Sequence, residues 1–144
     1  MPRYSKLGAY AYISTPANTT CTNAGEYYLL QGIFTNEILK GFSIDAFILT
    51  YNGQKQCFEI KVNASFITDT ANTEISMALF VNDVLQSNSI MVVEIDKTTD
   101  KQMISLVDVL ELEAGDEVSI RVASDKAGAI IQAITGNTSA QKYQ

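Results

Sequence analysis

The chain has no histidine and no tryptophan, and only two cysteines among its 144 residues. Without an imidazole, neither a histidine-based catalytic triad nor a histidine-ligated zinc site can form. Phosphate-binding glycine motifs of the GxGxxG or GxxxxGK[ST] type are missing as well. These gaps argue against an enzyme and indicate no cofactor and no metal.

Cys21 and Cys57 are too far apart in the sequence to form a zinc knuckle. The N-terminal segment Met1–Gly8 carries two positive charges but has no apolar run behind it, so it is not a secretory signal peptide. Cysteines in a chain without a signal are usually reduced, which favours two free thiols. A disulfide between them stays open as the minor alternative.

Positive charge is scarce, and the net charge is −6. This balance argues against a nucleic-acid partner and against an anionic membrane surface, since both require a basic face. No run approaches the ~20 apolar residues of a membrane helix. We therefore expect a soluble protein that is made in the cytoplasm and binds neither nucleic acid nor membrane.

Carboxylates are plentiful, with 16 aspartates and glutamates. A pair of them could act as acid and base on a sugar, but no spacing places two across a cleft. Most aspartates lie in predicted turns, where this side chain binds its own backbone. A loop cation held by Asp69, Asp96 or Asp100 stays open as a minor alternative.

Apolar residues alternate with polar ones over several long segments of the chain. The run Gln56–Ile67 places Phe58, Ile60, Val62, Ala64 and Phe66 on one face. Glu74–Val81 and Glu117–Ser124 show the same period of two. This period is typical of strands with one buried face, and strand–helix alternation is missing. The sequence predicts an all-β fold, an antiparallel two-sheet sandwich.

We expect about nine or ten strands in one domain, residues 9–136, between a flexible arm 1–8 and a polar tail 137–144. Asn36–Gly41 is predicted to be a turn or a single helical turn, and Leu106, Val107 and Val109 are candidate core residues. The expected strands are Ala9–Ser14, Thr19–Thr22, Tyr27–Phe34, Phe42–Tyr51, Gln56–Ile67, Glu74–Val81, Val84–Ile95, Gln102–Leu110, Glu117–Ser124 and Ala129–Thr135.

Three dipeptides are predicted to form tight turns. Asn52-Gly53 favours a β-hairpin, because both residues tolerate positive φ. Asn82-Asp83 is predicted to form a second tight turn. Gly115 permits a left-handed turn that Asp116 caps.

Several large apolar or aromatic residues fall on the outer faces of predicted strands. Adjacent strand residues point to opposite faces, so one of Tyr27 and Tyr28 must point outward. Such residues indicate a second buried surface, meaning another subunit, although scattered exposed apolar residues are also normal. The interface candidates are Tyr10, Tyr12, Tyr27, Tyr28, Ile67 and Phe80.

Four segments together carry a resemblance to a known family. They are Phe47–Gly53, Phe58–Ser65, Ile75–Asp83 and Val109–Val122. Their order and their Asn-Gly and Leu-x-x-Gly-Asp-x-Val elements resemble the trimeric jelly-roll domains of the tumour-necrosis-factor and complement-globular-head kind. The small version in bacteriophage virion proteins is the most similar. Asp83 stands where that pattern has glycine, and the match spans residues 42 to 135.

The resemblance implies a jelly roll that forms a homotrimer about a threefold axis, with the inner sheets of three subunits packed together. It transfers no catalytic or ligand residue, because the matched positions are structural. Such domains serve as heads of phage fibres or as free-standing capsid decoration proteins. The chain has no collagen repeat and no coiled-coil heptads before the domain, which favours decoration.

The expected partners are therefore the chain itself and a major capsid protein, and the expected location is the capsid surface of the virion. Arg3, Tyr4 and Lys6 in the N-terminal arm are candidates for anchoring to an acidic shell surface. A disordered terminus is the simpler interpretation of that arm. The alternative function is a receptor- or glycan-binding head of a tail or head fibre.

Overall fold

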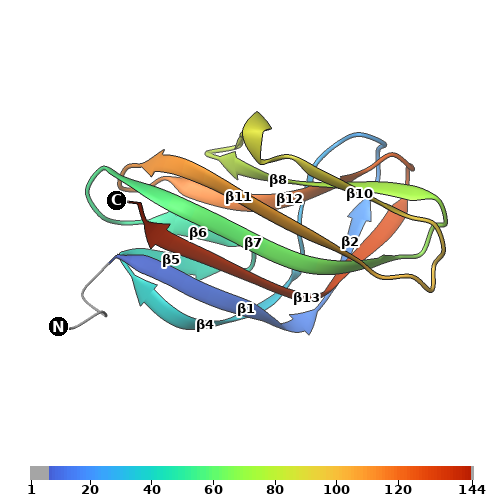
Figure 1. Ribbon diagram of the computed structural model, residues 1–144, viewed down its shortest axis with the longest axis horizontal. Helices are drawn as coiled ribbons and strands as arrows, with labels where there is room; N and C mark the ends of the chain where they lie inside the picture. The colour runs from blue at the N-terminus through green and yellow to red at the C-terminus, as the bar shows by residue number, and fades with distance from the viewer. Residues whose placement is uncertain (1–6, 144) are drawn as a thin grey trace.

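The computed structural model describes residues 7–143, which form two antiparallel β-sheets packed face to face (Figure 1). The described residues contain thirteen strands and one short 3-10 turn, Ser87–Ser89. None of these elements is a helix that could span a membrane. The prediction of an all-β, two-sheet jelly roll is confirmed, with more strands than expected within the described residues.

The six-stranded sheet has the order β11-β7-β13-β1-β4, and β2 pairs with the beginning of β13. Its long strand β7 pairs along most of its length with β11 on one side and β13 on the other. The strands are β1 (Gly8–Pro16), β2 (Asn18–Cys21), β4 (Gly32–Lys40), β7 (Gln56–Thr68), β11 (Gln102–Leu112) and β13 (Ala129–Lys142).

The seven-stranded sheet has the order β10-β8-β12-β6-β5, with β3 beside β12 and β9 beside β8. The strands are β3 (Tyr28–Leu29), β5 (Phe42–Asp45), β6 (Ile48–Tyr51), β8 (Thr73–Val81), β9 (Val84–Leu85), β10 (Met91–Ile95) and β12 (Glu117–Ser124). Because β10 and β11 are the last strands of their sheets, they lie together at one edge of the sandwich.

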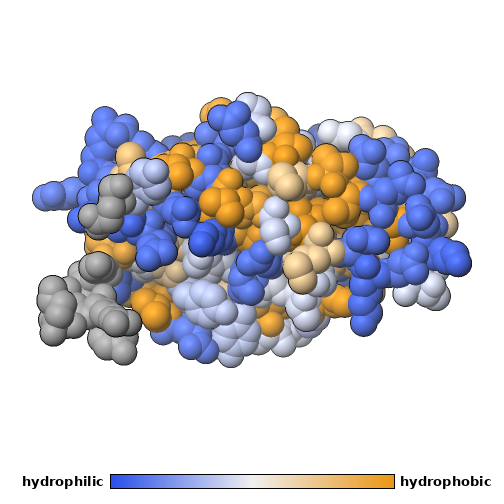
Figure 2. Space-filling view, in the orientation of Figure 1, coloured by the Kyte–Doolittle hydropathy of each residue, from blue (hydrophilic) through white to orange (hydrophobic). Residues whose placement is uncertain are grey.

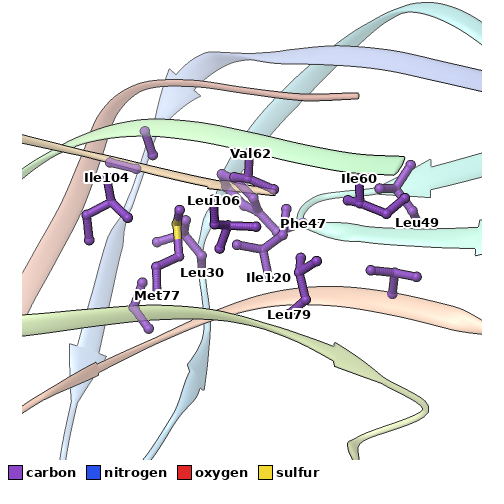
Figure 3. Close-up of a cluster of buried hydrophobic side chains, with 14 of the residues drawn as sticks. Leu30, Phe47, Leu49, Ile60, Val62, Met77, Leu79, Ile104, Leu106 and Ile120 are labelled. Carbon is purple, nitrogen blue, oxygen red and sulfur yellow. The ribbon is translucent and has the colours of Figure 1, made fainter. Parts of the chain in front are cut away.

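The core lies between the sheets and follows the predicted alternation. Ile60 and Val62 of β7 point toward Met77 and Leu79 of β8, with Phe47 between the layers (Figure 3). All five of these side chains are buried. The four strand residues are buried because they alternate onto the face of each strand that is packed away from water, whereas Phe47 enters the core from the turn between β5 and β6.

Three predicted strands are interrupted. Phe42–Tyr51 is a hairpin of β5 and β6 that turns at Ala46, whose φ is +52°. Val84–Ile95 divides into β9, the 3-10 turn and β10, and the Ser89 hydroxyl donates to the Gln86 carbonyl there. Tyr27–Phe34 divides at residues 30–31 between β3 in one sheet and β4 in the other.

Asn36–Gly41 is not a turn, because β4 continues as strand through Lys40 and pairs with β1. The chain reverses only at Gly41, which has a φ of +78°. Pairing with β1 outweighs the local polar composition that suggested a turn.

The predicted hairpin at Asn52-Gly53 is wrong, because β6 and β7 belong to different sheets. The loop carries the chain from one layer to the other, and Gly53 is required for space. A Cβ atom at Gly53 would lie 2.5 Å from the Tyr51 hydroxyl oxygen.

The predicted polar tail is also wrong over most of its length. Residues 137–142 are the second half of β13 and pair with both β1 and β7. Ala140 is buried there. At the other end, β1 begins at Gly8, and the rest of the predicted arm lies outside the described residues, except for Leu7 beside Gly41.

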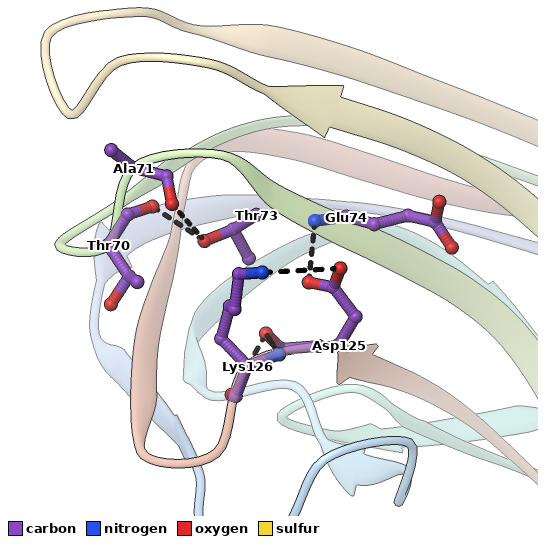
Figure 4. A network of polar contacts seen from close by, with 7 residues as sticks. Thr70, Ala71, Thr73, Glu74, Asp125 and Lys126 are labelled. Carbon is purple, nitrogen blue, oxygen red and sulfur yellow. Dashed lines mark hydrogen bonds and ion pairs between the residues drawn. The ribbon is translucent and has the colours of Figure 1, made fainter.

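At each end of the sandwich, side-chain hydrogen bonds join turns that lie next to each other. At one end, Asp125 accepts a hydrogen bond from the Glu74 backbone N–H at 2.9 Å and lies 3.9 Å from the Lys126 ammonium (Figure 4). The Thr73 hydroxyl donates to the Thr70 carbonyl at 2.6 Å in the same region. These bonds hold the β7–β8 turn against the β12–β13 turn.

At the other end, Asn82 and Asp83 have φ of +49° and +67° and join β8 to β9 as a tight hairpin. The Asn82 amide donates to the Asp116 carboxylate at 2.9 Å. That carboxylate also accepts the Glu113 backbone N–H at 2.8 Å and so closes the turn at Gly115, whose φ is +92°. The Glu113 and Asn82 hydrogen bonds together hold the pKa of Asp116 below its ordinary value.

Candidate self-association surface

The outward face of the six-stranded sheet carries apolar side chains along both of its sides. At one side, Tyr10 of β1 lies opposite Ile38 of β4, and Tyr12 follows on the same face. Both tyrosines are 36% exposed. We call this side the tyrosine margin, and it consists of Tyr10, Tyr12, Ile33 and Ile38.

The other side is the open edge of the sandwich, where β10 and β11 meet. On β11, Met103 is 62% and Val107 52% exposed. We call this side the edge margin. It consists of Met103, Val107 and Val109 on the outward face of β11, together with Met91 and Val92 of β10, the neighbouring edge strand of the other sheet. Apolar colour gathers over β10 and β11 in Figure 2. Exposed aliphatic groups gathered in one place on a small domain are typical of a binding surface.

Between the margins runs a polar strip, made of the outward side chains of β7 and β13 with Ser105 of β11. A row of hydrogen bonds crosses it: the Ser105 hydroxyl donates to the Asn63 amide oxygen at 2.6 Å, and the Asn63 amide donates to Asn137 at 3.2 Å. Lys61 and Glu59 form an ion pair in the same strip at 3.3 Å. The strip consists of Glu59, Lys61, Asn63, Ser65, Ser105, Asn137, Ser139 and Gln141.

The strip contains a shallow hollow of about 310 Å³ at Gly136, next to a register shift in β13. A Cβ atom at this glycine would lie 2.9 Å from Ile13 and 3.2 Å from the Asn63 carbonyl oxygen. A glycine at this position therefore lets Ile13 and the Asn63 carbonyl approach more closely than a side chain would allow. Tyr12, Asn63 and Asn137 are among the neutral residues that line it.

The six interface candidates do not gather in one place. Tyr10 and Tyr12 lie in the tyrosine margin, and Ile67 is half-buried on the same sheet opposite Gln132. Tyr28 lies on the other sheet, where its hydroxyl donates to Glu26 at 2.9 Å.

Phe80 is covered by its own chain and has little surface left for a partner. Its ring lies 5.4 Å from that of Tyr27, and the Arg121 guanidinium stacks over it at 4.3 Å. Only 8% of Phe80 is exposed. The outward-pointing phenylalanine is thus satisfied within the subunit by an aromatic pair and a cation–π contact.

The edge margin was not predicted from the sequence, because Val107 and Val109 were expected to lie in the core. Of the three residues expected there, only Leu106 is buried. Ile104, Leu106, Leu110 and Leu112 share the buried face of β11, with Asp108 in the same phase. The stricter alternation of these leucines and isoleucine was the signal that could have placed the two valines outside.

The acidic turns serve the fold. Asp69 accepts a hydrogen bond from the Ile130 backbone N–H at 2.8 Å and another from Thr70 at 2.9 Å. Within residues 7–143, no group of three or more side chains is arranged to hold a metal ion. Arg3, Tyr4 and Lys6 lie outside the described residues.

No protein-family model and no curated protein matches this chain. Among solved structures, the Eiger TNF of S. frugiperda has a TM-score of 0.64 at 8% identity, with 95% of this chain and 92% of that chain covered. Murine APRIL at pH 5.0 has a TM-score of 0.62 at 8% identity, with 93% of this chain and 98% of that chain covered. The chain therefore has the jelly-roll fold of tumour-necrosis-factor-like domains.

Proposed function

We propose that this chain is a non-enzymatic virion protein, a homotrimer that decorates the outer surface of a phage capsid and stabilises it. The observation that carries the self-association is the pair of unlike apolar margins at the two sides of the six-stranded sheet. The decoration role rests on the resemblance to phage virion domains, which implies three copies about one axis.

The two margins differ in position and chemistry. The edge margin is aliphatic and lies on the rim of the sandwich, whereas the tyrosine margin carries two aromatic rings on β1. Unlike patches pair head to tail, and such an interface either closes into a ring or continues as a filament. A closed ring of three satisfies both margins of every copy.

A threefold protein suits a capsid because capsomers meet at local threefold points. One repeated patch on the trimer can then touch three neighbouring copies of a major capsid protein. A protein that binds only the assembled shell stabilises it by mass action, and three linked weak contacts act together.

The self-association is tested by measuring the mass in solution. Light scattering of the purified chain should give three times the monomer mass. Val107→Asp in the edge margin should yield monomers, because it places a charge in an apolar contact. Val84→Asp is the matched control, since Val84 is exposed on β9 outside both margins. A wild-type monomer would overturn the proposal.

The role in the virion is tested by labelling. Antibody-gold on purified virions should mark the whole capsid, and adding the trimer to shells that lack it should raise their resistance to heat. A label confined to fibres would instead support the alternative, a receptor- or glycan-binding head. No label on virions would overturn both.

A further inference from the structure

The polar strip lies between two apolar margins, and this order has a consequence for the assembly. We propose that only the margins make contact between copies, and that the polar strip lines a water-filled channel along the threefold axis. This inference rests on the proposed trimer and adds to it which part of the face is dry and which is wet.

The first reason is the position of the strip in the sheet. The edge margin lies on β11 at one end of the strand order, and the tyrosine margin lies on β1 and β4 at the other. All of the strip except Ser105 lies on β7 and β13 in the middle. Three such faces joined side to side form the walls of a triangular prism, in which the middle of each wall faces the axis.

The second reason is the hydrogen bonding of the strip. An asparagine amide has two donor hydrogens. The Ser105–Asn63–Asn137 row uses one hydrogen of the Asn63 amide and neither of those of Asn137. An apolar neighbour would leave these groups unpaired, whereas water can satisfy them.

The third reason is the charge and shape of the strip. The Glu59–Lys61 pair lies within it, and about half of the Lys61 side chain is exposed. Taking both charges out of water would cost more than their attraction returns unless further partners were supplied. The hollow at Gly136 adds about 310 Å³ to the channel from each copy.

The channel is tested by the reactivity of single cysteines in the intact trimer. The background variant is Cys57→Ser, because Cys57 is half-buried on the outer side of β7. Cys21 can stay, because it is buried and its burial raises the thiol pKa to about 11. Two matched pairs are then compared, Ser65→Cys of β7 with the directly opposite Met103→Cys of β11, and Ser139→Cys with the directly opposite Tyr10→Cys.

In the trimer, a small neutral thiol reagent should label the Ser65→Cys and Ser139→Cys variants freely. The Met103→Cys and Tyr10→Cys variants should react more slowly by about tenfold or more. Dilution to monomers should remove the difference. The second pair keeps the test decisive if a variant of the first pair fails to fold or to assemble.

The outcomes separate the two proposals. Protection at both strip positions in a protein of trimer mass would overturn the channel and leave the trimer intact. Free reaction at the margin positions of a trimer would also overturn it, because another surface would then hold the copies together. A monomer at every concentration would overturn the proposed function itself.

Discussion

Two buried threonine hydroxyls differ in whether they have a partner. The Thr73 hydroxyl donates to the Thr70 carbonyl at 2.6 Å. Among the buried side-chain oxygen and nitrogen atoms of residues 7–143, Thr138 Oγ1 alone makes no hydrogen bond. Both side chains are almost fully buried on strands. A buried hydroxyl without a partner costs free energy that an apolar group of the same shape does not.

Thr138→Val should therefore raise the free energy of unfolding by ~1 kcal/mol. Thr73→Val is the matched control and should lower it by a similar amount, since it leaves a carbonyl without its donor. Urea denaturation of the two variants checks the difference. Equal losses in both would mean that Thr138 Oγ1 has a partner in solution.

Gly53 is the residue that fits the loop between the two sheets against Tyr51. Gly53→Ala should lower the free energy of unfolding by about 1–3 kcal/mol, because its Cβ would overlap the buried phenol ring. The adjacent and exposed Asn52→Ala should change it little. Thermal unfolding of both variants tests this, and an unchanged Gly53→Ala would show that the ring can move aside.

At the scale of the elements, carboxylates at the two ends of the sandwich have pKa shifts of opposite sign. Glu94 of β10 lies directly opposite Glu74 of β8. The hydrogen bond between Glu94 and Asp96, with the negative charge of Asp96, raises the pKa of Glu94 above its ordinary value of 4.5. At the other end, hydrogen bonds from Glu113 and Asn82 lower the pKa of Asp116 below 3.8.

The two shifts predict opposite pH dependences. Because the pKa of Glu94 is raised in the folded state, this residue stabilises the fold at pH values below its ordinary pKa. That contribution is lost as the pH rises through the folded pKa. Asp116, whose pKa is lowered, stabilises the fold at pH values above its ordinary pKa. That contribution is lost as the pH falls through the folded pKa.

Glu94→Gln should therefore raise the melting temperature at pH 7 and change it little at pH 3. Asp116→Asn should lower the melting temperature at pH 7, with a smaller effect as the pH falls below 3.8. Melting curves from pH 2 to pH 7 check both variants. If the melting temperatures of wild type and a variant differed by the same amount at every pH, the pKa shift of that residue would not be linked to stability.

At the scale of the whole molecule, self-association links stability to concentration. If folded copies assemble, the melting temperature should rise by a few degrees with each tenfold increase in protein concentration, because assembly removes folded monomer from the equilibrium. Val107→Asp should abolish this dependence, and Val84→Asp should keep it. Calorimetry at several concentrations checks this, and a constant wild-type melting temperature would contradict assembly.

Alternation was a reliable guide wherever a strand has one buried and one exposed face. It placed Phe58, Ile60 and Val62 correctly, and it gave β12 its observed limits. It also holds on β11, but Val107 and Val109 were assigned to the core because they are apolar, and both face outward. Apolar character alone does not distinguish a residue buried in its own core from one on an apolar outer face.

Residues that favour turns predicted a hairpin correctly only where the local backbone conformation determines the turn. Asn82 and Asp83 adopt positive φ and close a two-residue hairpin. Asn52 and Gly53 have the stronger local hairpin signal, yet the next strand joins the other sheet. Which sheet a strand joins depends on long-range pairing, which no dipeptide encodes.

What the amino-acid sequence alone determined is the all-β class, the period of two and the inward residues of the long strands, because these depend on local backbone preferences and on hydrophobicity. The tertiary structure decided which outer faces meet water. Phe80 is covered by Tyr27 and Arg121, whereas β10 and β11 meet to form an aliphatic edge. Strands distant in sequence create these surfaces by lying side by side, and only their arrangement in space determines which side chains remain for a partner.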